Sequence, residues 1–122
     1  MAERGRPRIL VVDDDPNLGT LLIEVLGEFA EVEEVASVPK AKQKLQEASF
    51  DFVISDLRFL DAKEDGLALF RWIEAHRPKL AKRFLLITGL EPEEPLPCPV
   101  MLKPFLFEEL VARVRAALEE TP

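Results

Sequence analysis

Short apolar runs alternate with longer amphipathic stretches along this chain of 122 residues. The runs are rich in Val, Ile, Leu and Phe, as strands buried on both faces of a parallel sheet are. They predict strands at residues 8–12, 50–55, 83–87 and 100–102. A further segment, 31–36, alternates charged and apolar residues, which is typical of an edge strand lying beside the first strand.

Helical periodicity fills the intervals between these strands. Asp15 is a good N-cap and Pro16 suits the first helical position, and Ser37 with Pro39 begins a second, weaker helix. A third helix is predicted at 66–77 and a last one at 107–118. The residues expected to face inward are Leu18, Leu21, Leu22, Val25, Leu26 and Phe29, then Ala41, Leu45 and Ala48, then Leu69, Phe70 and Ile73, and finally Phe107, Leu110, Val111, Val114 and Leu118. This order predicts an α/β fold of repeated strand–helix–strand units, in one domain over 1–122 with a core at about 8–119.

One interval breaks the alternation. Prolines at positions 92, 95, 97 and 99 lie between the last two strands, and no helix tolerates that density. We therefore predict a loop there, with Cys98 as an unpaired thiol within it.

Charged and hydroxyl side chains follow successive apolar strands. Asp13, Asp14 and Asp15 end the first strand, Asp56 ends the third, and Thr88 and Lys103 end the last two. Short right-handed connections bring the carboxyl ends of such strands to one sheet edge, where open α/β sheets bind ligands. The sequence therefore predicts a site at this edge, although each residue taken alone also fits an ordinary turn, and Asp15 a helix cap.

The chemistry of these groups is complementary. Clustered carboxylates need a cation to stay ionised together, and hard oxygen ligands suit Mg²⁺. Lys103 offers a charge and Thr88 a hydroxyl for phosphate oxygens. A carboxylate can accept a phosphoryl group when a metal and a lysine offset the charge, and Asp56, alone on its strand, is the best nucleophile candidate.

Composition excludes several classes of protein. Hydrophobic residues make up 48% and charged residues 32%, which predicts a globular domain rather than a disordered chain. The formal net charge of −7 argues against a nucleic-acid partner. No apolar stretch reaches membrane-spanning length and no signal-peptide core is present, so we expect a cytoplasmic protein without a membrane partner.

In these motifs the chain resembles the receiver domain of two-component response regulators. The resemblance rests on Ile9-Leu10-Val11-Val12-Asp13-Asp14, Phe52-Val53-Ile54-Ser55-Asp56-Leu57, Asp65-Gly66-Leu67, Thr88-Gly89 and Lys103-Pro104-Phe105. It implies a doubly wound parallel sheet of order 2-1-3-4-5, a topology illustrated by a member of this family. It also implies a cytoplasmic signalling switch rather than an enzyme with turnover, one that takes part in its own phosphoryl transfer and dephosphorylation.

The resemblance assigns roles residue by residue. Asp56 would accept a phosphoryl group from a sensor histidine kinase or phosphotransfer protein, as in a phosphorelay. Asp13, Asp14 and Asp56 would hold Mg²⁺, together with the backbone carbonyl of Arg58. Thr88 and Lys103 would bind phosphoryl oxygens, and the Lys103–Pro104 peptide would be cis.

Departures from the family pattern are equally informative. The fourth helix is expected to be missing or reduced, since the proline-rich interval stands between Thr88 and Lys103. Val100 stands where receivers usually carry Tyr or Phe, so the usual aromatic switch cannot operate. The loop after Asp56 differs at Phe59-Leu60, and Gly66 is displaced by about two residues through the segment 61–64. No output domain is expected after the last helix, so signalling would proceed by protein contact with an unknown downstream target.

Two other functions stay open. A receiver-like binding module could engage its partner regardless of phosphorylation. A haloacid-dehalogenase-like phosphatase also places Asp-x-Asp after a strand, but that family usually has Thr or Val where this chain has Asn17, and it needs a late acidic pair that is absent here.

Overall fold

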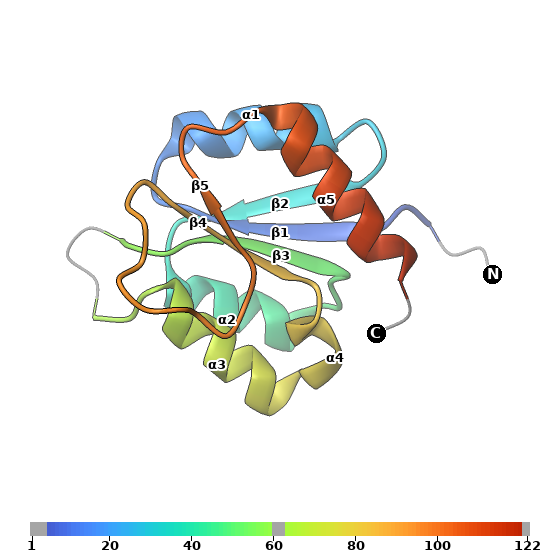
Figure 1. Cartoon of the computed structure of the whole chain (residues 1–122). Coiled ribbons are helices and arrows are strands. Elements are labelled where there is room, and N and C mark those ends of the chain that lie inside the picture. The colour runs from blue at the N-terminus through green and yellow to red at the C-terminus, as the bar shows by residue number, and fades with distance from the viewer. Residues whose placement is uncertain (1–4, 60–62, 121–122) are drawn as a thin grey trace.

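The computed structural model describes residues 5–59 and 63–120 of the chain. Its centre is a five-stranded parallel sheet of order β2-β1-β3-β4-β5 (Figure 1). The strands are β1 (Arg8–Val12), β2 (Glu31–Val35), β3 (Phe52–Asp56), β4 (Phe84–Thr88) and β5 (Val100–Leu102). The predicted strand order is confirmed, and the half-polar strand β2 lies at the edge beside β1 as expected.

Helices cover both faces of this sheet. They are α1 (Pro16–Leu26), α2 (Val38–Glu47), α3 (Gly66–His76), α4 (Pro78–Ala81) and α5 (Phe107–Glu119). In Figure 1, α1 and α5 lie on one face, and α2, α3 and α4 lie on the other. The molecule is therefore a doubly wound α/β domain, as the sequence predicted.

Each face has its own buried cluster, because successive residues of a strand point to opposite faces. Ile9 and Val11 pack with α1 and α5, while Leu10 and Val12 pack with α2 and α3. The side chains of β4 are all buried, as are the first four of β3. The continuous apolar runs of these strands are thus explained by burial on two faces.

The helix starts follow the predicted chemistry. The carboxylate of Asp15 accepts a hydrogen bond from the backbone nitrogen of Asn17, and the Ser37 hydroxyl accepts one from that of Lys40. Asp65 caps α3 in the same way through Ala68. A capping side chain is worth about 1 kcal/mol because it pairs a backbone N–H that the helix itself leaves free.

No helix lies between β4 and β5, where every residue is described; we call residues 89–99 the strap. The strap crosses the α2–α3 face of the sheet (Figure 1) and is anchored there by Cys98, which is buried, and by Leu96, which is half-buried. Burial raises the pKa of the Cys98 thiol to about 11, so the thiol is protonated at neutral pH. The predicted loss of the family's fourth helix is confirmed.

Three details correct the sequence-based expectations. A one-turn helix, α4, begins at Pro78, where only a helix end was predicted, so the described residues form five helices. Leu21, expected inside, is 44% exposed. Helix α1 ends at Leu26, so Phe29 packs on the core from the turn beyond it rather than from the helix.

Among the described residues, no helix is both long enough and apolar enough to cross a membrane.

Candidate functional site

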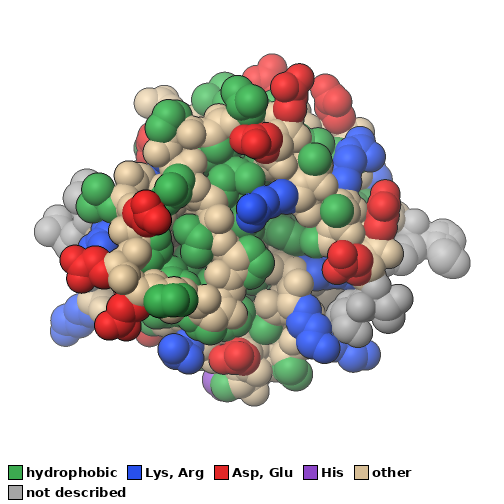
Figure 2. Space-filling view, in the orientation of Figure 1, with side chains coloured by type: hydrophobic (Ala, Val, Ile, Leu, Met, Phe, Trp, Pro, Cys, Tyr) green, Lys and Arg blue, Asp and Glu red, His purple; other side chains and the backbone are tan. Residues whose placement is uncertain are grey.

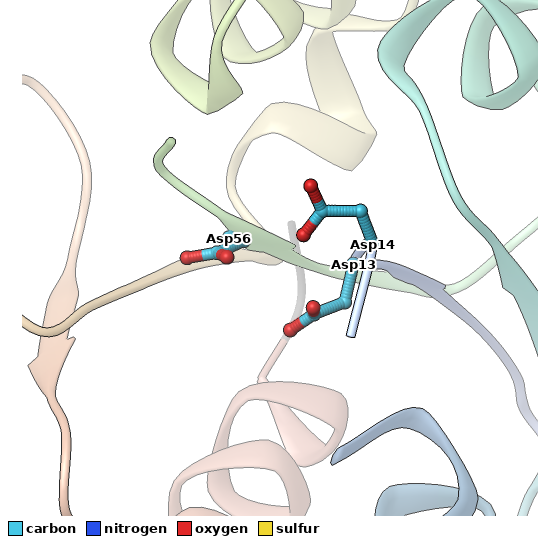
Figure 3. Close-up of side chains that lie close together, drawn as sticks. All are labelled: Asp13, Asp14 and Asp56. Carbon is cyan, nitrogen blue, oxygen red and sulfur yellow. The ribbon is translucent and has the colours of Figure 1, made fainter. Parts of the chain in front are cut away.

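Three carboxylates meet where β1 and β3 end. These strands are neighbours, with Val12 paired to Ser55, so the residues that follow emerge side by side. One oxygen from each of Asp13, Asp14 and Asp56 lies within 4.8 Å of the other two, as Figure 3 illustrates. The structure thus brings together the three side chains that the sequence predicted as metal ligands.

Asp13 is fixed by bonds on both its backbone and its side chain. Its backbone nitrogen donates to Val35 of β2 at 3.0 Å, and its carboxylate accepts from the Asp15 nitrogen at 2.7 Å. The side chain is buried, and burial raises the pKa of Asp13 to about 6, an effect to which the nearby Asp56 charge adds. The residue is held rigidly in a position where its own charge is unfavourable.

Asp56 is half-buried and faces a cation. One of its oxygens accepts from the Leu57 nitrogen at 3.0 Å, and the other lies 3.6 Å from Lys103 Nζ. Burial raises the pKa of Asp56, and the Asp14 charge adds to this, while Lys103 opposes it. This carboxylate therefore has one oxygen held by the backbone and one beside a positive charge.

Lys103 reaches the site from the end of β5. Its backbone nitrogen donates to the Thr88 carbonyl at 2.8 Å, which extends the β4–β5 pairing by one residue. The peptide bond between Lys103 and Pro104 is cis, as predicted from the resemblance.

Thr88 ends β4, the strand next to Asp56, and is buried. Its hydroxyl donates to the Leu90 carbonyl at 3.1 Å and accepts from the Leu90 nitrogen at 3.2 Å. The structure thus places Thr88 beside the site, yet ties its hydroxyl to the first residues of the strap rather than to the carboxylates.

Two further residues border Asp56. Arg58 follows the strand end and is exposed, and the role of its backbone carbonyl as a metal ligand stays a prediction. Gly66 begins α3 and donates its backbone N–H to the Leu57 carbonyl at 2.8 Å. A Cβ at Gly66 would lie 2.2 Å from the Asp56 carbonyl oxygen, so only glycine allows this approach. The sequence indicated Gly66 through its resemblance but not this packing role. Part of the loop to which its displacement was attributed, residues 60–62, lies outside the described residues.

The donor set fits a hard divalent cation. Three carboxylates within 4.8 Å offer the oxygen ligands that Mg²⁺ prefers, with room for waters at an open sheet edge. The raised pKa values of Asp13 and Asp56 also indicate a charge cluster that a cation would relieve. In chemical terms, the site joins a cation-binding cluster to a carboxylate beside a lysine.

Comparison with known proteins identifies a family and relatives with the same fold. The family model "Response regulator receiver domain" matches residues 9–94, so its match ends inside the strap. The regulatory protein VirG of Rhizobium radiobacter is 32% identical over 130 residues, covering 98% of this chain and 47% of VirG. VirG of Agrobacterium tumefaciens (strain 15955) gives the same identity and coverage. The chain spans about half the length of these curated relatives.

Solved structures share the whole fold. The non-phosphorylated HemR receiver domain from Leptospira biflexa superposes with a TM-score of 0.83 at 29% identity, covering 96% of this chain and 98% of that receiver domain. The BeF3-activated DrrB receiver domain gives 0.82 at 28% identity, covering 94% and 99%. The response regulator TrrA from Thermotoga maritima, solved in complex with Mg²⁺ and BeF, gives 0.77 at 26% identity, covering 91% and 98%.

Proposed function

This chain belongs to the family of response regulator receiver domains, and within that family we propose that it is a phosphoacceptor controlled by a histidine kinase. The observation that carries the proposal is the pairing of Asp56 with Lys103 at 3.6 Å beside the carboxylates of Asp13 and Asp14. The family match favours this function over the phosphatase alternative, because a receiver is a signalling switch.

Asp56 is the acceptor in this proposal because it is only half-buried and one of its oxygens lies 3.6 Å from the ammonium of Lys103. Asp13 is buried and its carboxylate is held by the Asp15 nitrogen, so we assign it to metal binding with Asp14. The Asp56 oxygen beside Lys103 attacks phosphorus, the P–N bond of the donor's phosphohistidine breaks, and its electron pair stays on the imidazole, which is then protonated. An acyl phosphate forms on Asp56.

Charge compensation makes this transfer possible. Lys103 lies beside the attacking oxygen and can follow the phosphoryl oxygens, as an ammonium on a flexible stem does. Bound at Asp13, Asp14, Asp56 and the Arg58 carbonyl, Mg²⁺ would supply positive charge for the transferred group. The carboxylate cluster would then be ionised while the acceptor stays beside its lysine.

The output step in this proposal begins at Thr88. Its hydroxyl now pairs with the Leu90 backbone, and a phosphoryl oxygen on Asp56 would compete for the same donor. Release of Leu90 changes the conformation of the first residues of the strap. This shifts the balance between two conformations of the surface that they form. We propose that a downstream protein reads this surface.

Intact-mass measurement after incubation with acetyl phosphate and Mg²⁺ tests the proposal. We expect one phosphoryl adduct on the wild type and none on Asp56→Asn. Asp51→Asn is the matched control, since Asp51 lies just before the opposite end of β3, and it should keep the adduct. An adduct on Asp56→Asn, or none on the wild type with any phosphodonor, would contradict the proposal.

One observation favours a second function. The strap replaces a helix, and Val100 stands where an aromatic residue usually serves the switch, so the partner surface differs from the family's usual one. A binding module that ignores phosphorylation would have equal partner affinity in the wild type and in Asp56→Asn, with or without phosphodonor. A difference between them supports the phosphorylation switch instead.

A further inference from the structure

A cavity of about 500 Å³ opens at the sheet edge opposite the carboxylate site. It lies between the ends of α2 and α3, the one-turn helix α4 and the loop that leads into β3. Its volume falls in the range of small-molecule sites. The apolar part of its wall is formed by Leu45, Ala48, Phe50, Pro78 and Leu80.

The polar part of the wall is positively charged, in a chain whose net charge is −7. Arg77, Lys79 and Arg83 line the cavity, whereas Asp51 is the one acidic residue among the described residues of its wall. The Asp51 carboxylate is already engaged, because it accepts a hydrogen bond from the Arg8 nitrogen at 2.8 Å. In Figure 2, Lys and Arg side chains gather at the lower right, in the region where Figure 1 places α4.

Two of these cationic side chains, Arg77 and Arg83, donate hydrogen bonds to carbonyls at helix ends. Arg77 donates to the carbonyls of His76 at 2.9 Å and Leu45 at 3.3 Å, so it covers the negative ends of α3 and α2. Arg83 donates to the Leu118 and Glu120 carbonyls beyond α5.

Two groups stay without such a role. Within the described residues, nothing pairs with the ammonium of Lys79, and the buried Nε of Arg83 has no hydrogen-bond partner. The Arg83 Nε is enclosed by protein atoms, however, so only Lys79 presents an unpaired charge to the cavity. The cavity therefore combines an apolar wall with one exposed cation, Lys79, that the fold leaves unused.

We propose that this cavity binds a small organic anion, an apolar body carrying one carboxylate or sulfonate. The apolar body packs against Leu45, Phe50 and Leu80, and the anionic group faces Lys79. The site lies at the end of the strands remote from Asp56, and the proposal does not depend on phosphorylation. Both sites can be occupied in one molecule.

An NMR titration of the ¹⁵N-labelled chain with 1-naphthoate tests the proposal, with uncharged 1-naphthamide as the matched ligand. We expect saturable shifts of amides at residues 48–51 and 79–83, which line or adjoin the cavity, and about fivefold weaker binding of the amide. Shifts confined to another surface, or equal binding of both ligands, would overturn the proposal.

Variants separate the cavity from general surface charge. Lys79→Gln should weaken 1-naphthoate binding about fivefold, whereas Lys82→Gln, on an exposed residue that does not line the cavity, should leave it unchanged. Ser49→Trp adds bulk at an exposed position of the wall and should abolish binding while the remaining amide spectrum stays native. Equal effects of Lys79→Gln and Lys82→Gln, or full binding to Ser49→Trp, would contradict the site.

Discussion

Charged side chains have opposite effects at the two ends of the parallel strands, which we call the amino edge and the carboxyl edge of the sheet. At the amino edge, arginines meet the carboxyl ends of helices, and Arg77 and Arg83 each donate to carbonyls that the helices leave free. These charges complement the helix dipoles and stabilise the fold. At the carboxyl edge, three carboxylates gather within 4.8 Å, and burial with mutual repulsion raises the pKa of two of them. Charge serves stability at one edge and opposes it at the other, as expected of a functional site.

The carboxyl edge should be the less tolerant of added volume. Gly66→Ala is expected to lower the free energy of unfolding by about 3 kcal/mol, because its Cβ would meet the Asp56 carbonyl at 2.2 Å and Leu86 at 2.6 Å. Gly89→Ala is the matched control at the same edge, since nothing lies within 4 Å of its Cβ position. Urea denaturation measures both, and equal losses would show that packing against Asp56 is not the cause.

Removing a charge from this edge should stabilise the metal-free protein. The pKa of Asp13 is raised from 3.8 to about 6, so its contribution to stability is fully present below its unfolded value and is lost as pH rises through 6. Asp13→Asn is therefore expected to be more stable than the wild type by about 2 to 3 kcal/mol at pH 8, with no such gain at pH 3.

The control for this variant is Asp15→Asn, because Asn caps a helix as well as Asp does. Thermal unfolding at the two pH values, with a chelator present, measures both. A wild type as stable as Asp13→Asn at pH 8 would contradict the assigned cost of the buried carboxylate.

At the amino edge, removing a charge should have the opposite sign. Arg83→Met keeps the apolar stem but loses the hydrogen bonds to the Leu118 and Glu120 carbonyls, at a cost of about 1 kcal/mol. Lys82→Met, at an exposed neighbour, should be neutral. Neither change should alter phosphorylation by acetyl phosphate, and a slower reaction in Arg83→Met would show that the two edges are not independent.

The smallest effect is expected on the edge strand. Glu33 binds Arg8 at 2.6 Å and Lys44 at 2.8 Å, and these cations lower its pKa. Its contribution is present above the unfolded value of 4.5 and is lost as pH falls through the lower folded value. Glu33→Gln should cost about 0.5 kcal/mol at neutral pH and less in about 1 M salt. Glu31→Gln, whose carboxylate lies 4.0 Å from Arg8, is the weaker control.

The sequence predicted best the features that depend on a pattern running over several residues. Apolar runs located the strands, and the residues that follow them located Asp13, Asp14, Asp56 and Lys103 at one edge. The strand order came from the resemblance to receivers, since periodicity does not choose between neighbours in a sheet. A four-residue helix such as α4 is too short to show a period, so it was missed.

Features that depend on fine packing could not be predicted. Leu21 lies at the margin of the apolar face of α1, where a small rotation of the helix decides whether a side chain is buried or exposed. The pairing of the Thr88 hydroxyl with Leu90 depends on a side-chain rotamer that no residue pattern encodes. The burial of Cys98 within a proline-rich loop likewise follows from how the strap lies on the sheet.

The strap also bears on how this domain can change its length. Across residues 89–99, all of which are described, no backbone hydrogen bond joins one strap residue to another. Adding one residue to a helix turns every later side chain by about 100° around its axis. The strap has no helical repeat, so a single residue inserted between Leu90 and Leu96 does not change the direction in which the Cys98 side chain points. The surface beside Thr88 can therefore be lengthened one residue at a time without repacking the core.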